Sequence, residues 1–232
     1  MRDRFPDRCR CASLEGMSTL STQEILQAGL DDWRPLAGTL RARFATGSFV
    51  AGLRLVEAVT EAAEAANHHP DVTLTYPHVD LSLVSHDVGA LTERDVELAR
   101  TISGIAADQG VSADPAAPTV LELALDTADR EAVAPFWAAV LTGDASNVDG
   151  DDVVDPSGRV PLLWLQGTQA HEEPRQRFHL DVWVAPDVAP ARITAATKAG
   201  GQVVDDSHAP SFTVLADAEG NKACVCTVLD RA

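Results

Sequence analysis

The sequence has 232 residues and carries 35 acidic against 18 basic side chains, which gives a formal net charge of −17. This acidic balance argues against nucleic acid and anionic membranes as general partners, because both need a basic footprint on the protein. No apolar run approaches the roughly 20 residues that cross a bilayer. Hydrophobic residues make up 45% of the chain, so the composition predicts a soluble protein with a sizeable core.

The N-terminal residues 1–18 form an arginine-rich leader that lacks the apolar segment of a signal peptide. We expect this leader to be disordered. The cysteines occur as Cys9-x-Cys11 and Cys224-x-Cys226, a spacing that differs from that of common zinc and redox motifs. Four cysteines are too few for a disulfide scaffold, so we expect a cytoplasmic protein in a reducing environment.

Short strands and longer helices alternate in the first half of the predicted structure. Hydrophobic residues recur at helical spacing after Ser48, and apolar and polar residues alternate after His78, as in a half-buried strand. The motif Thr92-x-x-Asp95 is typical of a capping box at the start of a helix. The expected elements are a helix at 21–28, a strand at 40–44, a helix at 48–67, strands at 72–75 and 78–85, and a helix that begins after 92.

A segment rich in alanine and proline, residues 111–118, has the composition of a linker, and we place a domain boundary there. Beyond it the pattern restarts as roughly two strand-helix-strand-strand units in tandem. We therefore expect one domain at 19–110 and a second at 119–232. The expected elements of the second are a strand at 120–125, a helix at 129–140, strands near 161–166 and 177–184, a helix at 188–199, and strands near 202–204, 211–215 and 222–228.

Histidines concentrate between residues 64 and 95, where four of the seven in the chain occur. Glu64 precedes His68 by four residues, so we expect both side chains on one face of the helix. The helix macrodipole and the carboxylate both favour an imidazolium at the C-terminal end. A protonated imidazole there could act as a general acid, and His86, at the end of a separate strand, offers a second imidazole for base catalysis.

Each of these residues also has a structural explanation. Histidines such as His68 and His69 are often simple C-terminal caps, and adjacent histidines cannot easily reach one zinc ion. Asp95 is explained by the capping box, His78 by a solvated strand face and Tyr76 by packing. The spacing by itself leaves these alternatives open.

One long motif passes through this region, and it reads Glu64-x-x-x-His68-His69-Pro70, then Tyr76, Ser85-His86 and Thr92-x-x-Asp95. It resembles the motif of the pterin-4a-carbinolamine dehydratases, and the resemblance covers about residues 20–110. This family removes water from 4a-hydroxytetrahydropterin to give the quinonoid dihydropterin, without a metal or an organic cofactor. The resemblance implies an α+β fold, an antiparallel sheet with helices on one face, and assembly into dimers or tetramers.

The resemblance also implies the roles of individual residues. The catalytic residues would be His68, His69, His86 and Glu64, and the substrate-binding residues would be Tyr76 and Asp95. In a workable mechanism, one imidazolium, that of His68 or His86, protonates the leaving 4a-hydroxyl, and a neutral imidazole accepts the ring-nitrogen proton. His69 and Glu64 would hold the pterin and fix the protonation states.

One position departs from the family pattern, and it affects substrate binding. The family often has an aromatic residue two positions after the proline, whereas Asp71-Val72 follows Pro70 here. A stacking contact to the pterin would then be missing, which bears on affinity more than on chemistry.

In the second half, the sequence contains Phe136-Trp137, Phe178-His179-Leu180-Asp181 and Asp217-x-Glu219-Gly220-Asn221. These segments are similar to glyoxalase-like domains of the vicinal oxygen chelate superfamily. The resemblance implies paired βαβββ modules around a cleft, often with a divalent metal, and places the metal ligands at Glu122, His179 and Cys224. Cys224 is a poor ligand for a hard, oxygen-preferring metal, so a packed core thiol stays an alternative at this position.

The sequence thus leaves three hypotheses of different classes. The first is a pterin dehydratase with a glyoxalase-like domain of unknown role, with pterin as substrate. The second is a non-catalytic module, since the dehydratase family includes dimerisation partners of transcription factors. The third places the main activity, metal-dependent chemistry or small-molecule binding, in residues 119–232.

Overall fold

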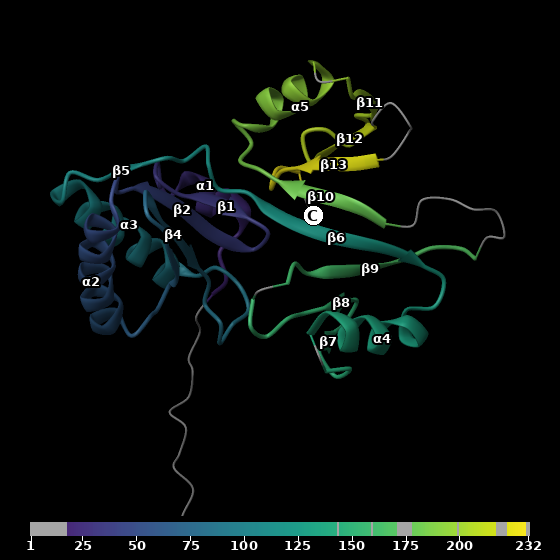
Figure 1. Ribbon diagram of the computed structural model, residues 1–232, viewed down its shortest axis with the longest axis horizontal. Helices are drawn as coiled ribbons and strands as arrows, with labels where there is room; N and C mark the ends of the chain where they lie inside the picture. The colour runs from purple at the N-terminus through teal and green to yellow at the C-terminus, as the bar shows by residue number, and fades with distance from the viewer. Residues whose placement is uncertain are drawn as a thin grey trace, which may run out of the picture.

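The computed structural model describes residues 18–142, 144–158, 160–170, 178–198, 200–216 and 222–230. Two β-sheets dominate the described part, and each carries its own helices (Figure 1). The expected leader, except Ser18, and the motif at residues 217–221 lie outside the described residues. No described helix is both long enough and apolar enough to pass through a membrane.

The first sheet has the strand order β1-β2-β4-β3, with β5 paired to β2, and all these pairings are antiparallel. Three helices accompany it. The elements are α1 (Thr22–Gln27), β1 (Arg34–Leu36), β2 (Thr39–Ala45), α2 (Phe49–Ala66), β3 (Asp71–Leu74), β4 (His78–Leu83), α3 (Glu93–Asp108) and β5 (Ser112–Ala113).

Alternation along the strands gives this sheet one apolar face and one polar face. The apolar face is buried under α2 and α3 in a single core cluster, whose strand and helix members include Leu40, Phe44, Val79, Leu55 and Ile102. On the opposite face lie the alternate residues of β2 and β4, which are polar. This arrangement confirms the expected α+β fold with helices on one face of an antiparallel sheet.

The second sheet has eight strands in the order β11-β12-β13-β10-β6-β9-β8-β7. Its centre is the antiparallel pair β6 and β10, and each of these strands has a parallel neighbour, β9 and β13 respectively. This near-symmetry is what paired βαβββ modules predict. The elements are β6 (Val120–Thr127), α4 (Arg130–Thr142), β7 (Val148–Asp149), β8 (Asp152–Val153), β9 (Leu163–Gly167), β10 (Phe178–Trp183), α5 (Ala189–Lys198), β11 (Gln202–Asp205), β12 (Phe212–Ala216) and β13 (Lys222–Cys226).

The segment expected to be a plain linker contains part of the first sheet. Within residues 111–118, β5 pairs with Phe44 and Ala45 at the end of β2. The alanine and proline content of this segment concealed the strand, because a strand of two residues has no periodicity to detect. The division into two domains at this segment stays a prediction.

The turn between β1 and β2 connects the two sheets. Leu36 is 0% exposed and clusters with Trp183 and Cys226 of the second sheet. Ala37 and Gly38 both have positive φ values, 45° and 74°, as a tight hairpin turn with matching twist requires. The hairpin therefore presents Leu36 to the second sheet at a fixed angle.

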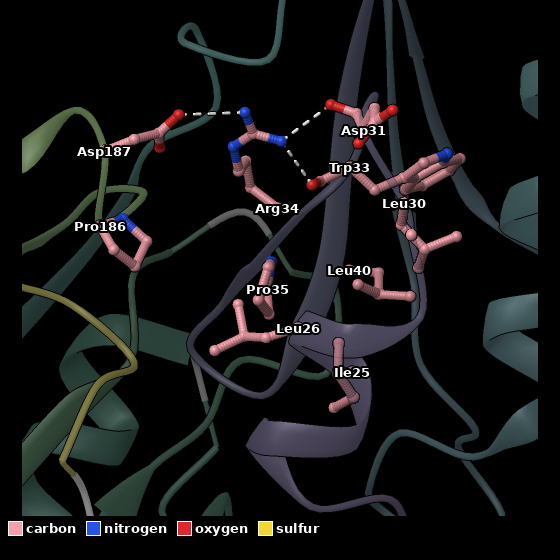
Figure 2. A pocket seen from close by; sticks show the side chains of 11 residues that line it. Ile25, Leu26, Leu30, Asp31, Trp33, Arg34, Pro35, Leu40, Pro186 and Asp187 are labelled. Atoms are coloured by element: carbon pink, nitrogen blue, oxygen red, sulfur yellow. Dashed lines mark hydrogen bonds and ion pairs between the residues drawn. The ribbon is translucent and has the colours of Figure 1, made fainter.

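A second contact between the two sheets lies beside a cavity of about 420 Å³ (Figure 2). Arg34 donates from Nη2 to the Asp187 carboxylate at 3.2 Å, and from Nη1 to the carbonyl oxygens of Asp31 and Trp33 at 2.9 Å each. This arginine therefore has partners on both sides of the cavity. The two sheets contact each other directly as well as through the chain that joins them.

We expect Leu36→Ala to destabilise the protein by about 2–5 kcal/mol, because the truncation removes buried contacts and leaves a cavity. The matched control is Leu26→Ala, whose side chain is 45% exposed, and its effect should be much smaller. Urea unfolding with separate probes for the two halves would measure both. Equal effects of the two substitutions would contradict the role of Leu36 between the sheets.

Candidate functional site

The helix α2 ends at an asparagine that changes the direction of the chain. Asn67 has φ 47° and ψ 42°, the left-handed conformation typical of a helix C-cap. His68 therefore lies outside the helical register. The expectation that Glu64 supports His68 is wrong for this reason, because the Glu64 carboxylate instead lies 3.1 Å from Nε2 of His69.

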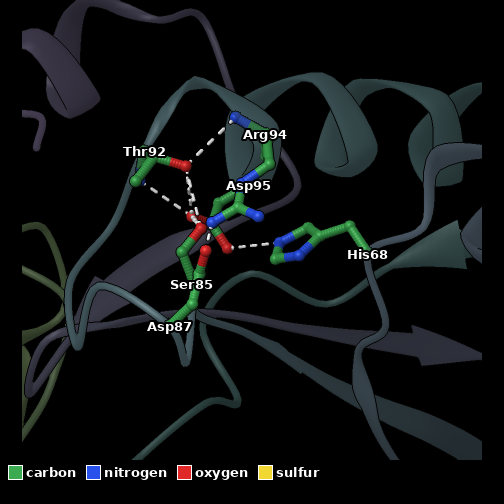
Figure 3. A network of polar contacts seen from close by, with 6 residues as sticks. All are labelled: His68, Ser85, Asp87, Thr92, Arg94 and Asp95. Carbon is green, nitrogen blue, oxygen red and sulfur yellow. Dashed lines mark hydrogen bonds and ion pairs between the residues drawn. The ribbon is translucent and has the colours of Figure 1, made fainter. Parts of the chain in front are cut away.

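His68 instead pairs with Asp95 at the start of α3 (Figure 3). Its Nε2 lies 2.7 Å from Oδ1 of the carboxylate, and the two side chains are 7% and 0% exposed. The other carboxylate oxygen accepts hydrogen bonds from the Thr92 backbone N–H at 2.8 Å and the Ser85 hydroxyl at 2.7 Å. Both oxygens of this buried carboxylate are thus satisfied, as a buried charge requires.

This pairing determines which ring nitrogen of His68 is available. A carboxylate accepts only, so Nε2 carries the proton that it donates to Asp95. In the described part of the chain, Nδ1 of His68 has no hydrogen-bond partner. The pair therefore leaves Nδ1 as the atom that can exchange a proton with a substrate.

Asp95 was expected to bind substrate, and the structure corrects this expectation. Its carboxylate is fully buried behind His68, Ser85 and Thr92, so it has no surface to offer a ligand. Asp95 serves both as the capping-box residue and as a part of the site. One of its oxygens caps α3, and the other accepts a hydrogen bond from the imidazole of His68. The Ser85 contact was missed, since no local motif links it to Asp95.

The other candidate residues lie at the surface. His69 and Glu64 form a pair in which each side chain is more than half exposed, so solvent weakens their attraction. His86 and Tyr76 are exposed, and neither side chain has a hydrogen bond in the part of the chain that the structure describes. His86 lines a cleft of about 990 Å³. One candidate imidazole is thus buried and oriented and the others are exposed, and the residues that line the cleft at His86 do not include His68.

An ion pair that the sequence did not reveal lies beside this network. Arg94 follows the N-cap of α3 and donates from Nη2 to the Asp87 carboxylate at 2.5 Å (Figure 3). The hydrogen bond from Arg94 lowers the pKa of Asp87, which is also near the His68 ring. The pair links the loop between β4 and α3 to the first turn of α3.

In the second sheet, three possible metal ligands gather on neighbouring strands. His179 and Asp181 of β10 and Cys224 of β13 each offer an atom within 4.8 Å of the others. Among the described residues, the expected ligand Glu122 is not in this group, and one oxygen of its carboxylate accepts the indole N–H of Trp183. Glu122 lies opposite Asp181 across the β6–β10 pair, and Cys224 lies opposite Asp181 on the other side, so the ligand set that the resemblance implies stays a prediction and Asp181 is a further candidate.

The hydrogen bonds of His179 oppose a metal at this place. Its Nδ1 lies 3.0 Å from the Asp181 carboxylate and its Nε2 lies 3.1 Å from Oε1 of Gln166. A metal ligand needs a free ring nitrogen, so one of these contacts would have to break. The set of one imidazole, one carboxylate and one thiol also does not fit a hard, oxygen-preferring ion.

The hydrogen bond with Asp181 raises the pKa of His179, with burial acting in the opposite direction. A raised folded-state pKa contributes stability below the unfolded value of about 6.5 and loses it as pH rises through the folded value. We therefore expect Asp181→Asn to destabilise the protein at pH 5 by about 1.5–3 kcal/mol. The difference from wild type should shrink by pH 9, and urea unfolding across this range would measure it. A difference that does not change with pH would contradict this account.

Comparison with known proteins agrees with both halves of the fold. Residues 17–105 match the family described as pterin 4 alpha carbinolamine dehydratase, and residues 122–226 match a glyoxalase-like domain. A crystal structure titled transcriptional coactivator/pterin dehydratase, from Brucella melitensis, is 27% identical with a TM-score of 0.37. It covers 38% of this chain and 99% of that one.

Among curated relatives, a provisionally named pterin-4-alpha-carbinolamine dehydratase of Mycobacterium avium (strain 104) is 38% identical over 91 residues, which are 38% of this chain and 97% of the relative. A relative with the same name from Acidobacterium capsulatum is 41% identical over 78 residues, 34% of this chain and 85% of its own length. The chain therefore belongs, through its N-terminal part, to the pterin-4-alpha-carbinolamine dehydratase family, and it carries a glyoxalase-like domain behind that part.

Proposed function

We propose that the N-terminal part dehydrates 4a-hydroxytetrahydropterin to the quinonoid dihydropterin by histidine acid–base catalysis. The observation that carries the proposal is the buried His68–Asp95 pair, which fixes the ring and leaves Nδ1 available. Such a pair is the usual way to hold an imidazole in one tautomer for proton transfer. Family membership supports the same substrate class.

In the proposed reaction, the bond between C4a and the hydroxyl oxygen breaks while N5 loses its proton. An acid delivers one proton to the leaving oxygen, which departs as water. A base takes the N5 proton, and the N5 electron pair forms the double bond to C4a. Protons and electrons balance, so no redox partner or metal is needed.

We infer that two histidines have different roles in this reaction. Neutral His68, with its Nε2 proton held by Asp95, presents a lone pair at Nδ1 and suits the base. Exposed His86 lies in the open cleft and suits the acid that protonates the leaving hydroxyl. His69 with Glu64 and Tyr76 would also contact the pterin, as the resemblance to the family implies.

We also propose that the protein self-associates, as expected for this family. The helix α2 exposes Phe49, Val50 and Leu53 near its N-terminus, and all three are at least 44% exposed. Neighbouring exposed apolar side chains of this kind often mark an interface between proteins. The alternative hypothesis, a non-catalytic interaction module, would use the same surface without any need for the His68–Asp95 pair.

For the glyoxalase-like domain we propose binding without a resident metal. The hydrogen bonds at both nitrogens of His179 support this, since both partner atoms are oxygens that accept, and a nitrogen that donates its N–H has no lone pair for a metal. The competing hypothesis places metal-dependent chemistry at His179, Asp181 and Cys224.

The first test measures dehydration of 4a-hydroxytetrahydropterin by wild type and by His68→Ala and His86→Ala. We expect each variant to lose on the order of 10²-fold or more of kcat, since each removes a proton-transfer group. His78→Ala is the matched control. His78 begins β4, the strand that precedes His86 in the chain, and it has no proposed role. Wild-type activity no greater than the spontaneous rate would rule out the dehydratase.

In the same assay, Asp95→Asn tests whether Asp95 orients the His68 ring or only fills space in the core, because asparagine has nearly the same size. An amide can donate a hydrogen bond to the ring, so it permits the wrong tautomer of His68, and kcat should fall while the folded structure is retained. Far-ultraviolet and near-ultraviolet circular dichroism would check the fold.

Metal analysis of the purified protein tests the second domain. After dialysis against a chelator and addition of Zn²⁺, we expect less than one equivalent to remain bound after gel filtration. Retention of one equivalent, lost in both His179→Gln and Cys224→Ser, would instead support the metal-dependent alternative.

A further inference from the structure

The cleft that contains His86 has walls from both halves of the chain. Its volume is about 990 Å³. One wall is the polar face of the first sheet, and the other consists of residues 117–119 and the loop 154–158, which leads from β8 towards β9. Any ligand that enters at His86 therefore meets groups that the first domain alone does not provide.

Strand pairing orders the polar side chains along this wall. Arg41 of β2 lies opposite Ser82 of β4, and in the next row towards the other end of β4, Arg43 lies opposite Asp80. Ser82 precedes His86 by four residues, so the two are separated by at most about 14 Å of extended chain. A pterin ring with a short side chain can span from His86 to the row that contains Arg41.

The two arginines of the wall differ in their partners. Arg43 binds both carboxylate oxygens of Asp80, at 2.6 and 2.8 Å, so its charge is neutralised. Arg41 has one hydrogen bond, from Nε to the Thr39 hydroxyl at 3.0 Å. Its two terminal nitrogens have no hydrogen bond and no carboxylate within 4.0 Å in the described part of the chain.

Arg41 is also withdrawn from water. Burial lowers the pKa of its guanidinium, while Asp71 and Asp80 act in the opposite direction from a distance. A guanidinium still keeps its charge in proteins. A partly desolvated cation with free donors is costly unless an anion pairs with it, and the planar fork of the guanidinium suits a phosphate or a carboxylate.

The other charged groups of the cleft do not fill this place. Asp155 accepts the backbone N–H groups of Ser157 and Val160, which turns its carboxylate towards its own loop. Asp71 of the edge strand β3 lies opposite Ser82 and so in the same row as Arg41, but its exposed carboxylate is more than 4.0 Å from the guanidinium. The side chains of Ser82 and Thr73 have no hydrogen bond among the described residues, so they remain available to a ligand.

We propose that the hydropterin bound at His86 carries an anionic group, phosphate or carboxylate, on its C6 side chain, and that Arg41 binds this group in the cleft. The proposal rests on the proposed function, because it assumes a pterin at His68 and His86. It gives the glyoxalase-like domain a part in substrate selection, since residues 154–158 line the same cleft as Arg41.

Calorimetric binding of stable dihydropterins to the full chain tests the proposal. Three probes share the ring: one has a neutral trihydroxypropyl side chain at C6, one has its terminal phosphate ester, and one ends in a carboxylate. We expect wild type to bind at least one anionic probe tenfold or more tightly than the neutral one. Arg41→Gln should remove this preference and leave the affinity for the neutral probe unchanged.

The matched control is Arg54→Gln, which removes an exposed arginine of α2 outside the cleft and should keep the preference. The phosphate and carboxylate arms tell which anion the site accepts. Equal binding of all three probes by wild type, or a preference that survives Arg41→Gln, would overturn the proposal and leave the dehydratase intact. Failure of wild type to bind any probe, together with absent dehydratase activity, would overturn both.

Discussion

The buried pair of His68 and Asp95 is the interaction on which the arrangement of the first site depends. A fully buried carboxylate is tolerated only where every lone pair meets a donor, and here the donors come from the loop before α3, the N-terminus of α3 and the end of α2. One side chain thus fixes the start of one helix and the orientation of the imidazole that follows another. The same carboxylate therefore caps α3 and restrains the orientation of the imidazole.

The two halves of the chain are held together by side-chain contacts as well as by the segment that connects them. Leu36 is buried against Trp183 and Cys226, Arg34 reaches Asp187, and the cleft at His86 has one wall in each half. These contacts belong to different elements of both sheets, so they fix an orientation and not only a distance. A glyoxalase-like partner held in this way can influence which ligands reach the first site without performing chemistry on them.

Much of the fold could be predicted from the sequence, because strong periodicity survives without tertiary information. The alternation in β4 identified its buried face, and the helical spacing after Ser48 identified α2. Strands of two or three residues, such as β1 and β5, have no detectable period. At the site, helical spacing suggested that Glu64 supports His68, but the left-handed Asn67 ended the register first. Glu122 was placed among the metal ligands by resemblance, whereas Asp181 of the observed cluster became visible only when the strands were paired.

The hairpin that carries Leu36 has a consequence for how this chain can be taken apart. A fragment that ends before residue 119 would leave an entirely buried leucine facing water, and the complementary fragment would uncover Trp183 and Cys226. Each piece would then carry an apolar patch complementary to the other. Mixed in solution, such fragments should associate through these two patches. The covalent junction would then raise the effective concentration of one half near the other, while the patches themselves supply the complementary surface.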